Sequence, residues 1–156
     1  MPIDEFHFRQ VMGHFASGVT VVTTELEGQL YGLTVSSFAS LSLVPQLLLI
    51  CIDNKLATHD ILHSAGRFAV NILKQEQSDL SRRFATRDAD KFKGVAYHFG
   101  VLNLPLLDGV LATIECNVHS TAPGGDHTIF VGEVIDAQAD QGAPLLYYRS
   151  GYRELA

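Results

Sequence analysis

The order of apolar and polar positions predicts a chain built mainly from strands. Apolar residues at helical spacing between Phe8 and Phe15 predict a first helix, which Asp4 caps and Gly18 ends. The β-branched run at 19–24 then favours a strand. A helix followed by strands opens the chain.

A hairpin and a buried strand are expected next. A turn at 27–29 leads into a second strand at 30–35, which pairs with the strand before it. Residues 47–52 are apolar without alternation, which predicts a strand buried on both faces, entered through Pro45.

The middle of the chain mixes helices and strands. Thr58 is expected to cap a short helix that Gly66 ends, followed by a strand at 67–73 and a helix at 75–85. Residues 86–94 are the most charged stretch, which predicts a solvated loop or a short helix.

A long hairpin is expected in the last third. Residues 111–120 alternate, a turn occupies 122–126, and a further strand covers 127–135. Six or seven strands with two or three helices, and no regular strand–helix alternation, favour an antiparallel barrel or sandwich. No linker or repeat divides the chain, so residues 1–156 are expected to form one domain.

Composition changes this picture in one respect. Of the 156 residues, 47% are apolar and only 18% are charged, below the usual share of about 25%. Such a surface favours a buried subunit interface or a ligand groove. The net charge of −6 argues against nucleic acid as a partner, because phosphate backbones bind basic surfaces.

The sequence shows no recognisable membrane-spanning or secretory signal. The longest apolar run, at 47–52, is far short of the roughly 20 residues that cross a bilayer. No basic stretch leads into an apolar block at the start. We therefore expect a cytoplasmic protein with no membrane partner.

The cysteines and a histidine pair give little support for metal chemistry. Cys51 and Cys116 lie in apolar runs and are expected to be free thiols, with a disulfide as the alternative. His59 and His63 could share a helix face, but the Glu of a zincin motif is missing. We expect no metal site.

Three segments could carry chemistry, although Rossmann, P-loop and nucleophile-elbow motifs are all missing. Five hydroxyls between Thr34 and Ser42 could hold phosphate or ribityl oxygens, or could form a polar edge strand. Arg82 and Arg83 could grip a phosphate or point to solvent. His127, directly after a glycine-rich turn, could be catalytic or structural.

Together these segments resemble the short-chain flavin reductase family, small NAD(P)H:flavin oxidoreductases with an FMN-binding split barrel. The resemblance covers nearly the whole chain in the expected order. The matching stretches are residues 15–24, 32–38, 49–53, 58–59, 66–73, 80–85, 125–134 and 144–149.

The resemblance implies a mainly β fold, a six-stranded antiparallel Greek-key split barrel with flanking helices. It also implies a homodimer with the flavin sites near the interface. His127 would face the flavin ring and the nicotinamide as the catalytic residue. The cofactor-binding residues that it implies are Thr34, Ser36, Ser37, Cys51, Ile52, Asp53, Lys55, His59, Ser81, Arg82, Phe84, His127 and Tyr148.

The implied function is hydride transfer from NADH or NADPH to FMN or FAD, with reduced flavin passed to an oxygenase component. Such chemistry needs no protein nucleophile, because the two nucleotides contain the reacting atoms. Two alternatives remain open. One is a flavoprotein that keeps FMN and reduces another acceptor, such as a ferric chelate, and the other is a non-enzymatic flavin- or haem-binding module.

Overall fold

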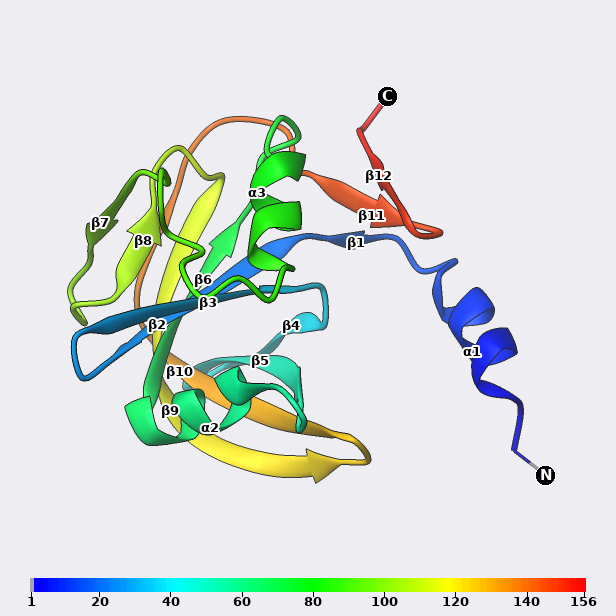
Figure 1. Ribbon diagram of the computed structural model, residues 1–156, viewed down its shortest axis with the longest axis horizontal. Coiled ribbons are helices and arrows are strands. Elements are labelled where there is room, and N and C mark those ends of the chain that lie inside the picture. Colours follow the sequence, from blue (N-terminus) through cyan, green and yellow to red (C-terminus); the bar gives the residue numbers. More distant parts are fainter. Residues whose placement is uncertain (1) are drawn as a thin grey trace.

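A computed structural model describes residues 2–156 and shows a mainly antiparallel β protein with three helices (Figure 1). The helices are α1 (Glu5–Met12), α2 (Ala57–Ala65) and α3 (Ser78–Phe84). The strands are β1 (Ser17–Gly18), β2 (Thr20–Leu26), β3 (Gln29–Val35), β4 (Phe38–Leu43), β5 (Gln46–Asp53), β6 (Arg67–Ile72), β7 (Tyr97–Phe99), β8 (Pro105–Leu107), β9 (Ala112–Gly124), β10 (His127–Ala139), β11 (Leu146–Tyr148) and β12 (Gly151–Arg153).

One sheet of seven strands dominates, in the order β3-β2-β6-β9-β10-β5-β4, with smaller sheets β1-β11-β12 and β7-β8 beside it. The expected class, mainly β with antiparallel sheets and few helices, is confirmed. The expected strand count of six is not: the hydrogen-bonded sheet has seven strands, and its edge strands β3 and β4 do not pair with each other among residues 2–156.

Both hairpins predicted from the pattern are present. β2 and β3 meet at Glu27 and Gly28, which both have positive φ, as a two-residue type I′ turn requires. The β9–β10 hairpin is longer than predicted, because β9 continues to Gly124 and β10, which begins at His127 as predicted, continues to Ala139. Gly125, at the turn, has φ +66°, a conformation that favours glycine.

Strand β5 departs from its predicted burial. Leu48, Ile50 and Ile52 are buried in the core, whereas the residues between them are only partly covered. The apolar run therefore hides one face from solvent, and the other face stays half-covered in the single chain. Helix α2 follows this strand in the sequence and packs against β2, β3 and β6.

The helix limits also differ from the prediction. α1 begins after Asp4, whose carboxylate accepts from the His7 N–H as a cap, but it ends at Gly13, well before Gly18. Leu56 occupies the N-cap of α2 in place of Thr58, and Gly66 ends that helix with a left-handed φ as predicted. α3 is shorter than expected, beginning at Ser78.

Residues 86–94, predicted as a solvated loop or a short helix, form an irregular loop, although Phe92 within it is buried. No helix among residues 2–156 is long and apolar enough to cross a membrane.

Candidate functional site

The connection between β3 and β4 offers hydrogen-bond donors that the protein itself does not use. Ser36 and Ser37 are exposed, and neither their hydroxyls nor their backbone N–H groups have a partner within residues 2–156. The Ser37 carbonyl accepts from the Cys51 N–H at 3.0 Å, which holds the connection against β5. Free hydroxyls and N–H groups at a strand end suit an oxygen-rich ligand such as a phosphate or ribityl chain.

Helix α3 and the C-terminal strand border this connection on one side. The Thr34 hydroxyl donates to the Ser81 carbonyl at 2.6 Å, and the Ser81 and Tyr152 hydroxyls are 2.7 Å apart. The Arg82 guanidinium lies over the Tyr152 ring, 4.9 Å from its centroid, with its side chain 60% exposed. Arg82 is therefore available to an anionic group, and Tyr152 is a neighbour that the sequence interpretation missed.

The other two expected contributors on α3 behave differently from Arg82. Arg83 donates to the carbonyls of residues 90, 91 and 93, so it anchors the charged loop. Phe84 is fully buried, and its ring fills the space beside Gly32. Contrary to its expected place in the cofactor site, Phe84 offers no side-chain surface to a ligand, because it belongs to the core.

The carboxyl end of β5 meets the β9–β10 turn on the opposite side of the connection. In the antiparallel register Cys51 pairs with Ile129, and Asp53 pairs with His127. The Asn54 N–H donates to the Asp126 carbonyl at 3.0 Å, which closes the two turns against each other. The structure thus brings the expected residues Cys51, Ile52, Asp53 and His127 together.

At this end of β5, backbone atoms are more available to a ligand than side chains are. Ile52 is 1% exposed and belongs to the core. The Asp53 carboxylate accepts from the Lys55 N–H at 2.9 Å. Burial raises the pKa of the Cys51 thiol, so it stays protonated at neutral pH.

His127 has one ring nitrogen held and the other free among the described residues. Its Nδ1 is 2.7 Å from an Asp126 carboxylate oxygen, and a carboxylate only accepts, so Nδ1 carries the proton. In the neutral ring, Nε2 is then an acceptor, and the side chain is 41% exposed. This hydrogen bond, then the charge of His127 and more weakly that of Lys55, lowers the pKa of the Asp126 carboxyl.

His59 lies next to this turn, and its side chain is largely buried. Its side chain is 15% exposed. Its Nε2 lies 2.9 Å from the Thr128 hydroxyl and its Nδ1 lies 2.9 Å from Asp60. Both ring nitrogens are engaged, so the structure does not support the expected direct contact of His59 with a cofactor.

Tyr148 is also separated from the expected site. Its ring pairs with His14 at 6.3 Å, next to the N-terminal helix, whereas Tyr147 packs against Tyr152 at 5.5 Å. Neighbouring residues of a strand point to opposite faces. Within one chain, Tyr147 is therefore the residue that lies near Arg82.

The cysteines are free, as expected. Cys116 is buried, and burial together with the nearby Glu115 charge raises its pKa to about 12. No cluster of metal-ligating side chains occurs within residues 2–156.

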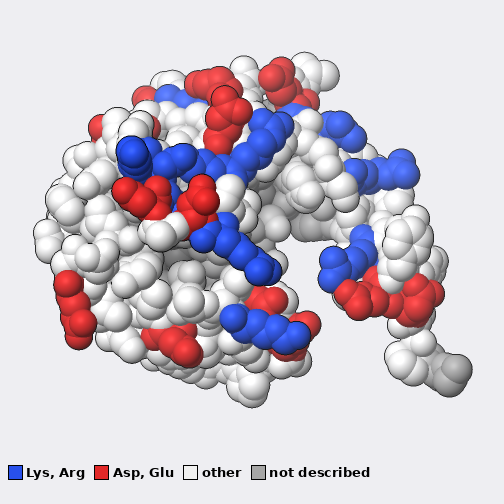
Figure 2. All heavy atoms as spheres, viewed as in Figure 1, with Lys and Arg blue, Asp and Glu red and all other residues white. Residues whose placement is uncertain are grey.

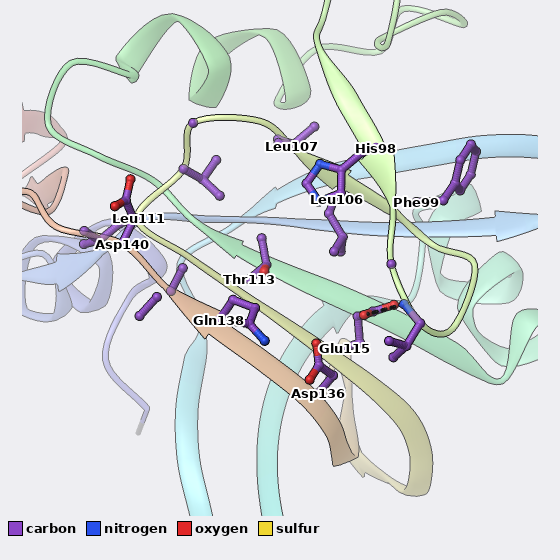
Figure 3. A pocket seen from close by; sticks show the side chains of 16 residues that line it. His98, Phe99, Leu106, Leu107, Leu111, Thr113, Glu115, Asp136, Gln138 and Asp140 are labelled. Carbon is purple, nitrogen blue, oxygen red and sulfur yellow. Dashed lines mark hydrogen bonds between the residues drawn. The ribbon is translucent and has the colours of Figure 1, made fainter.

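A groove lies away from these turns, between the β7–β8 ribbon and strands β9 and β10, with a volume of about 650 Å³ (Figure 3). Glu115 borders this groove but is only 1% exposed. Its carboxylate accepts from the N–H groups of Val101 and Leu102 at 3.0 and 2.9 Å. Glu115 therefore fixes a loop and is not free to bind a ligand.

A second hollow separates the body of the molecule from the projecting helix α1, and Figure 2 shows Lys and Arg side chains on both sides of it, with Asp and Glu among them. A band of basic side chains also covers the region of α3. Although the chain has a net charge of −6, this face offers cations to a phosphorylated ligand.

Comparison with known proteins identifies the class to which this fold and these turns belong. Residues 12–156 match the model of the flavin reductase like domain. The chain therefore belongs to the flavin reductase family, an oxidoreductase family, as its motifs predicted.

Three relatives are similar over four-fifths or more of their own length. The chain is 46% identical to the reductase component of 4-nitrophenol 4-monooxygenase/4-nitrocatechol 2-monooxygenase from Rhodococcus opacus, over 97% of this chain and 81% of that protein. An NADH:FAD oxidoreductase of Streptomyces globisporus, solved with NAD and FAD fragments, superposes with a TM-score of 0.95 at 38% identity, covering 98% of this chain and 93% of that one. A flavin reductase solved in its native state gives 0.92 at 39% identity and covers 99% of both chains.

Proposed function

We propose that this protein is an NAD(P)H-dependent flavin reductase that reduces FMN or FAD and supplies the reduced flavin to a partner monooxygenase. The observation that carries the proposal is the juxtaposition of unused donors at Ser36 and Ser37 with the exposed ring of His127, joined through β5. Membership of the flavin reductase family supports the same reaction. Similarity to reductase components of monooxygenases supports the partner.

A bound flavin would supply the redox chemistry, because its N5 accepts a hydride from C4 of the dihydronicotinamide. The nicotinamide is oxidised, and the flavin takes both electrons with that hydride. The chain has to hold and orient the two nucleotides and stabilise the charge that collects on the flavin. Ser36 and Ser37 would hold ribityl or phosphate oxygens, and the backbone from Cys51 to Asp53 would border the ring. Arg82 would meet the phosphate end, with Thr34 and Ser81 fixing the strand end beside it.

His127 is proposed to orient the nicotinamide. Because Asp126 holds the proton on Nδ1, a neutral His127 presents a lone pair at Nε2. That atom can accept a hydrogen bond from the N–H of a carboxamide, the polar group of the nicotinamide ring. Lys55, close enough to Asp126 to lower its pKa, would add positive charge at the same mouth.

We also infer NADH and FAD as the preferred pair. The similar NADH:FAD oxidoreductase from Streptomyces globisporus supports this choice. The proposal predicts a lower KM for NADH than for NADPH, and for FAD than for FMN.

A homodimer of single-domain, split-barrel chains is proposed as the assembly. Helix α1 has no buried residue, and its apolar side chains are exposed, Phe6 by 70% and Phe15, just beyond its end, by 78%. Val44, between β4 and β5, is 92% exposed. The half-covered face of β5 adds to this apolar surface, which a second copy would cover.

An anaerobic reduction experiment tests the reaction itself. Protein of known flavin content is mixed with excess FAD and limiting NADH, and flavin bleaching is compared with NADH consumed. The proposal predicts one FAD reduced per NADH oxidised, well beyond one turnover. NADH oxidation without flavin bleaching, or no oxidation with any flavin, would refute it.

A further inference from the structure

Three polar side chains, of which Asn54 and Thr128 were not among the expected contacts, connect helix α2 to the turn that bears His127. The His59 Nε2 lies 2.9 Å from the Thr128 hydroxyl, and the Thr128 hydroxyl donates to the Asn54 side-chain oxygen at 2.6 Å. Asn54 and His59 come from the turn after β5 and from α2, and Thr128 comes from β10, which is distant from both in the sequence. Nothing in the hydride transfer itself requires these contacts.

The chain of hydrogen bonds continues to His127 through the backbone. The Asn54 N–H donates to the Asp126 carbonyl at 3.0 Å, and the Asp126 carboxylate holds the His127 ring at 2.7 Å. Four hydrogen bonds thus lead from a helix to the exposed imidazole. Asp126 is exposed and the turn contains Gly125 at positive φ. Backbone pairing of His127 with Gly124 and with Asp53 fixes the base of the turn, whereas this series of hydrogen bonds holds the His127 side chain.

His59, at the far end of this series of hydrogen bonds, is anchored in the core. The His59 ring packs edge-on against Phe130, with centroids 5.7 Å apart, and against His63 at 4.9 Å. Phe130 is fully buried. His59 therefore has a fixed position from which it can restrain Thr128, whereas the exposed Asp60 supplies only its second contact.

We propose that Asn54, Thr128 and His59 act as positioning residues that fix His127 for its contact with the nicotinamide. This rests on the proposed function, because it assumes that His127 faces that ring. The Thr128 hydroxyl has one proton, so it donates to the Asn54 oxygen when the His59 Nε2 carries a proton of its own. If the Asn54 amide is turned so that its nitrogen faces Thr128, each hydroxyl and ring nitrogen still finds a donor or acceptor.

Thr128 is the best residue at which to interrupt this series of hydrogen bonds. Thr128→Val keeps the shape and removes the hydroxyl, and Thr128→Ser restores the hydroxyl. Thr121→Val is the matched control, since Thr121 is exposed on the neighbouring strand and its hydroxyl has no partner within residues 2–156. His59→Leu and His59→Gln make the same comparison at the far end.

Steady-state kinetics and amide hydrogen exchange give two independent measurements. For Thr128→Val we expect the KM for NADH to rise roughly five- to tenfold, with kcat and the flavin Kd changed by less than about twofold. Exchange at the Asn54 amide should quicken by a similar factor. Thr128→Ser should recover most of both values, and His59→Gln should recover more than His59→Leu.

Several results would overturn the positioning role. Thr128→Val could match Thr121→Val in both measurements, or Thr128→Ser could fail to recover either one. The flavin Kd could also weaken as much as the KM for NADH rises, which would indicate a general loosening of the site. If the unmodified protein oxidises no NADH, the proposed function fails, but the exchange measurement at Asn54 still tests the chain of contacts.

Discussion

His127 lies where the turn after β5 meets the β9–β10 turn, and its Nε2 is open to a ligand. Replacing it by Ala removes the acceptor that we assign to the nicotinamide carboxamide. We expect His127→Ala to raise the KM for NADH about tenfold, the effect of losing one hydrogen bond of about 1.4 kcal/mol. Flavin affinity, measured by fluorescence titration, should change by less than about twofold. An equal loss of NADH use and flavin binding would contradict the assignment.

The Asp126 carboxylate provides a pH test of the same contact. The hydrogen bond from His127 and the charge of that ring lower the pKa of Asp126. A carboxyl with a lowered pKa contributes to stability above its ordinary value of about 3.9, and this contribution is lost as the pH falls through the lowered pKa. By NMR titration, Asp126 should therefore titrate below about 3.9 in the unmodified protein and move upward in His127→Ala. The same titration in both proteins would show that the contact does not form.

Residue patterns identified the segments of the site better than the particular side chains. The hydroxyls at Ser36 and Ser37 and the histidine after the glycine turn lie at the junction, as the motifs suggested. Asn54 and Thr128 were missed although each follows a predicted residue directly, because a side-chain bond between distant segments leaves no periodic signal. The burial of the Phe84 ring was not predicted, because a matching motif does not say whether a ring faces the core.

At the scale of elements, the packing of β3 against α3 depends on a missing side chain at Gly32. A Cβ at this position would lie 2.5 Å from the Phe84 ring, whereas at Gly18 it would meet nothing within 4 Å. We expect Gly32→Ala to lower the free energy of unfolding by about 1–3 kcal/mol, the usual cost of overpacking. Gly18→Ala should change it by less than about 0.5 kcal/mol. Urea unfolding measures both, and equal values would show that the close packing is absent.

The elements with a local signal were predicted well. The two hairpins, the αL end of α2 and the Asp4 cap follow from turn and capping chemistry that a few residues carry. The half-covered face of β5 and the order of the seven strands could not be derived in this way. Both depend on which strands become neighbours, and in the sheet order β3-β2-β6-β9-β10-β5-β4 three of the six neighbouring pairs join strands that are far apart in the sequence.

At the scale of the molecule, the low share of charge and the uncovered apolar helix α1 lead to the same expectation. Gel filtration with light scattering should give about twice the chain mass of 17.1 kDa. Replacing Phe6 and Phe8, which are 70% and 51% exposed, by Ser should weaken the association without unfolding the chain. A mass near 17.1 kDa at micromolar concentration would contradict the dimer.

The central claim is that the junction of the two turns binds a flavin that exchanges with solution and is reduced by NADH. Its most direct test is the rate of NADH oxidation against added FAD, on protein whose flavin content has been measured. We predict a rate near zero without added FAD and a hyperbolic rise to saturation. A rate that is independent of added FAD would indicate a retained flavin, and no oxidation at any FAD concentration would contradict the claim.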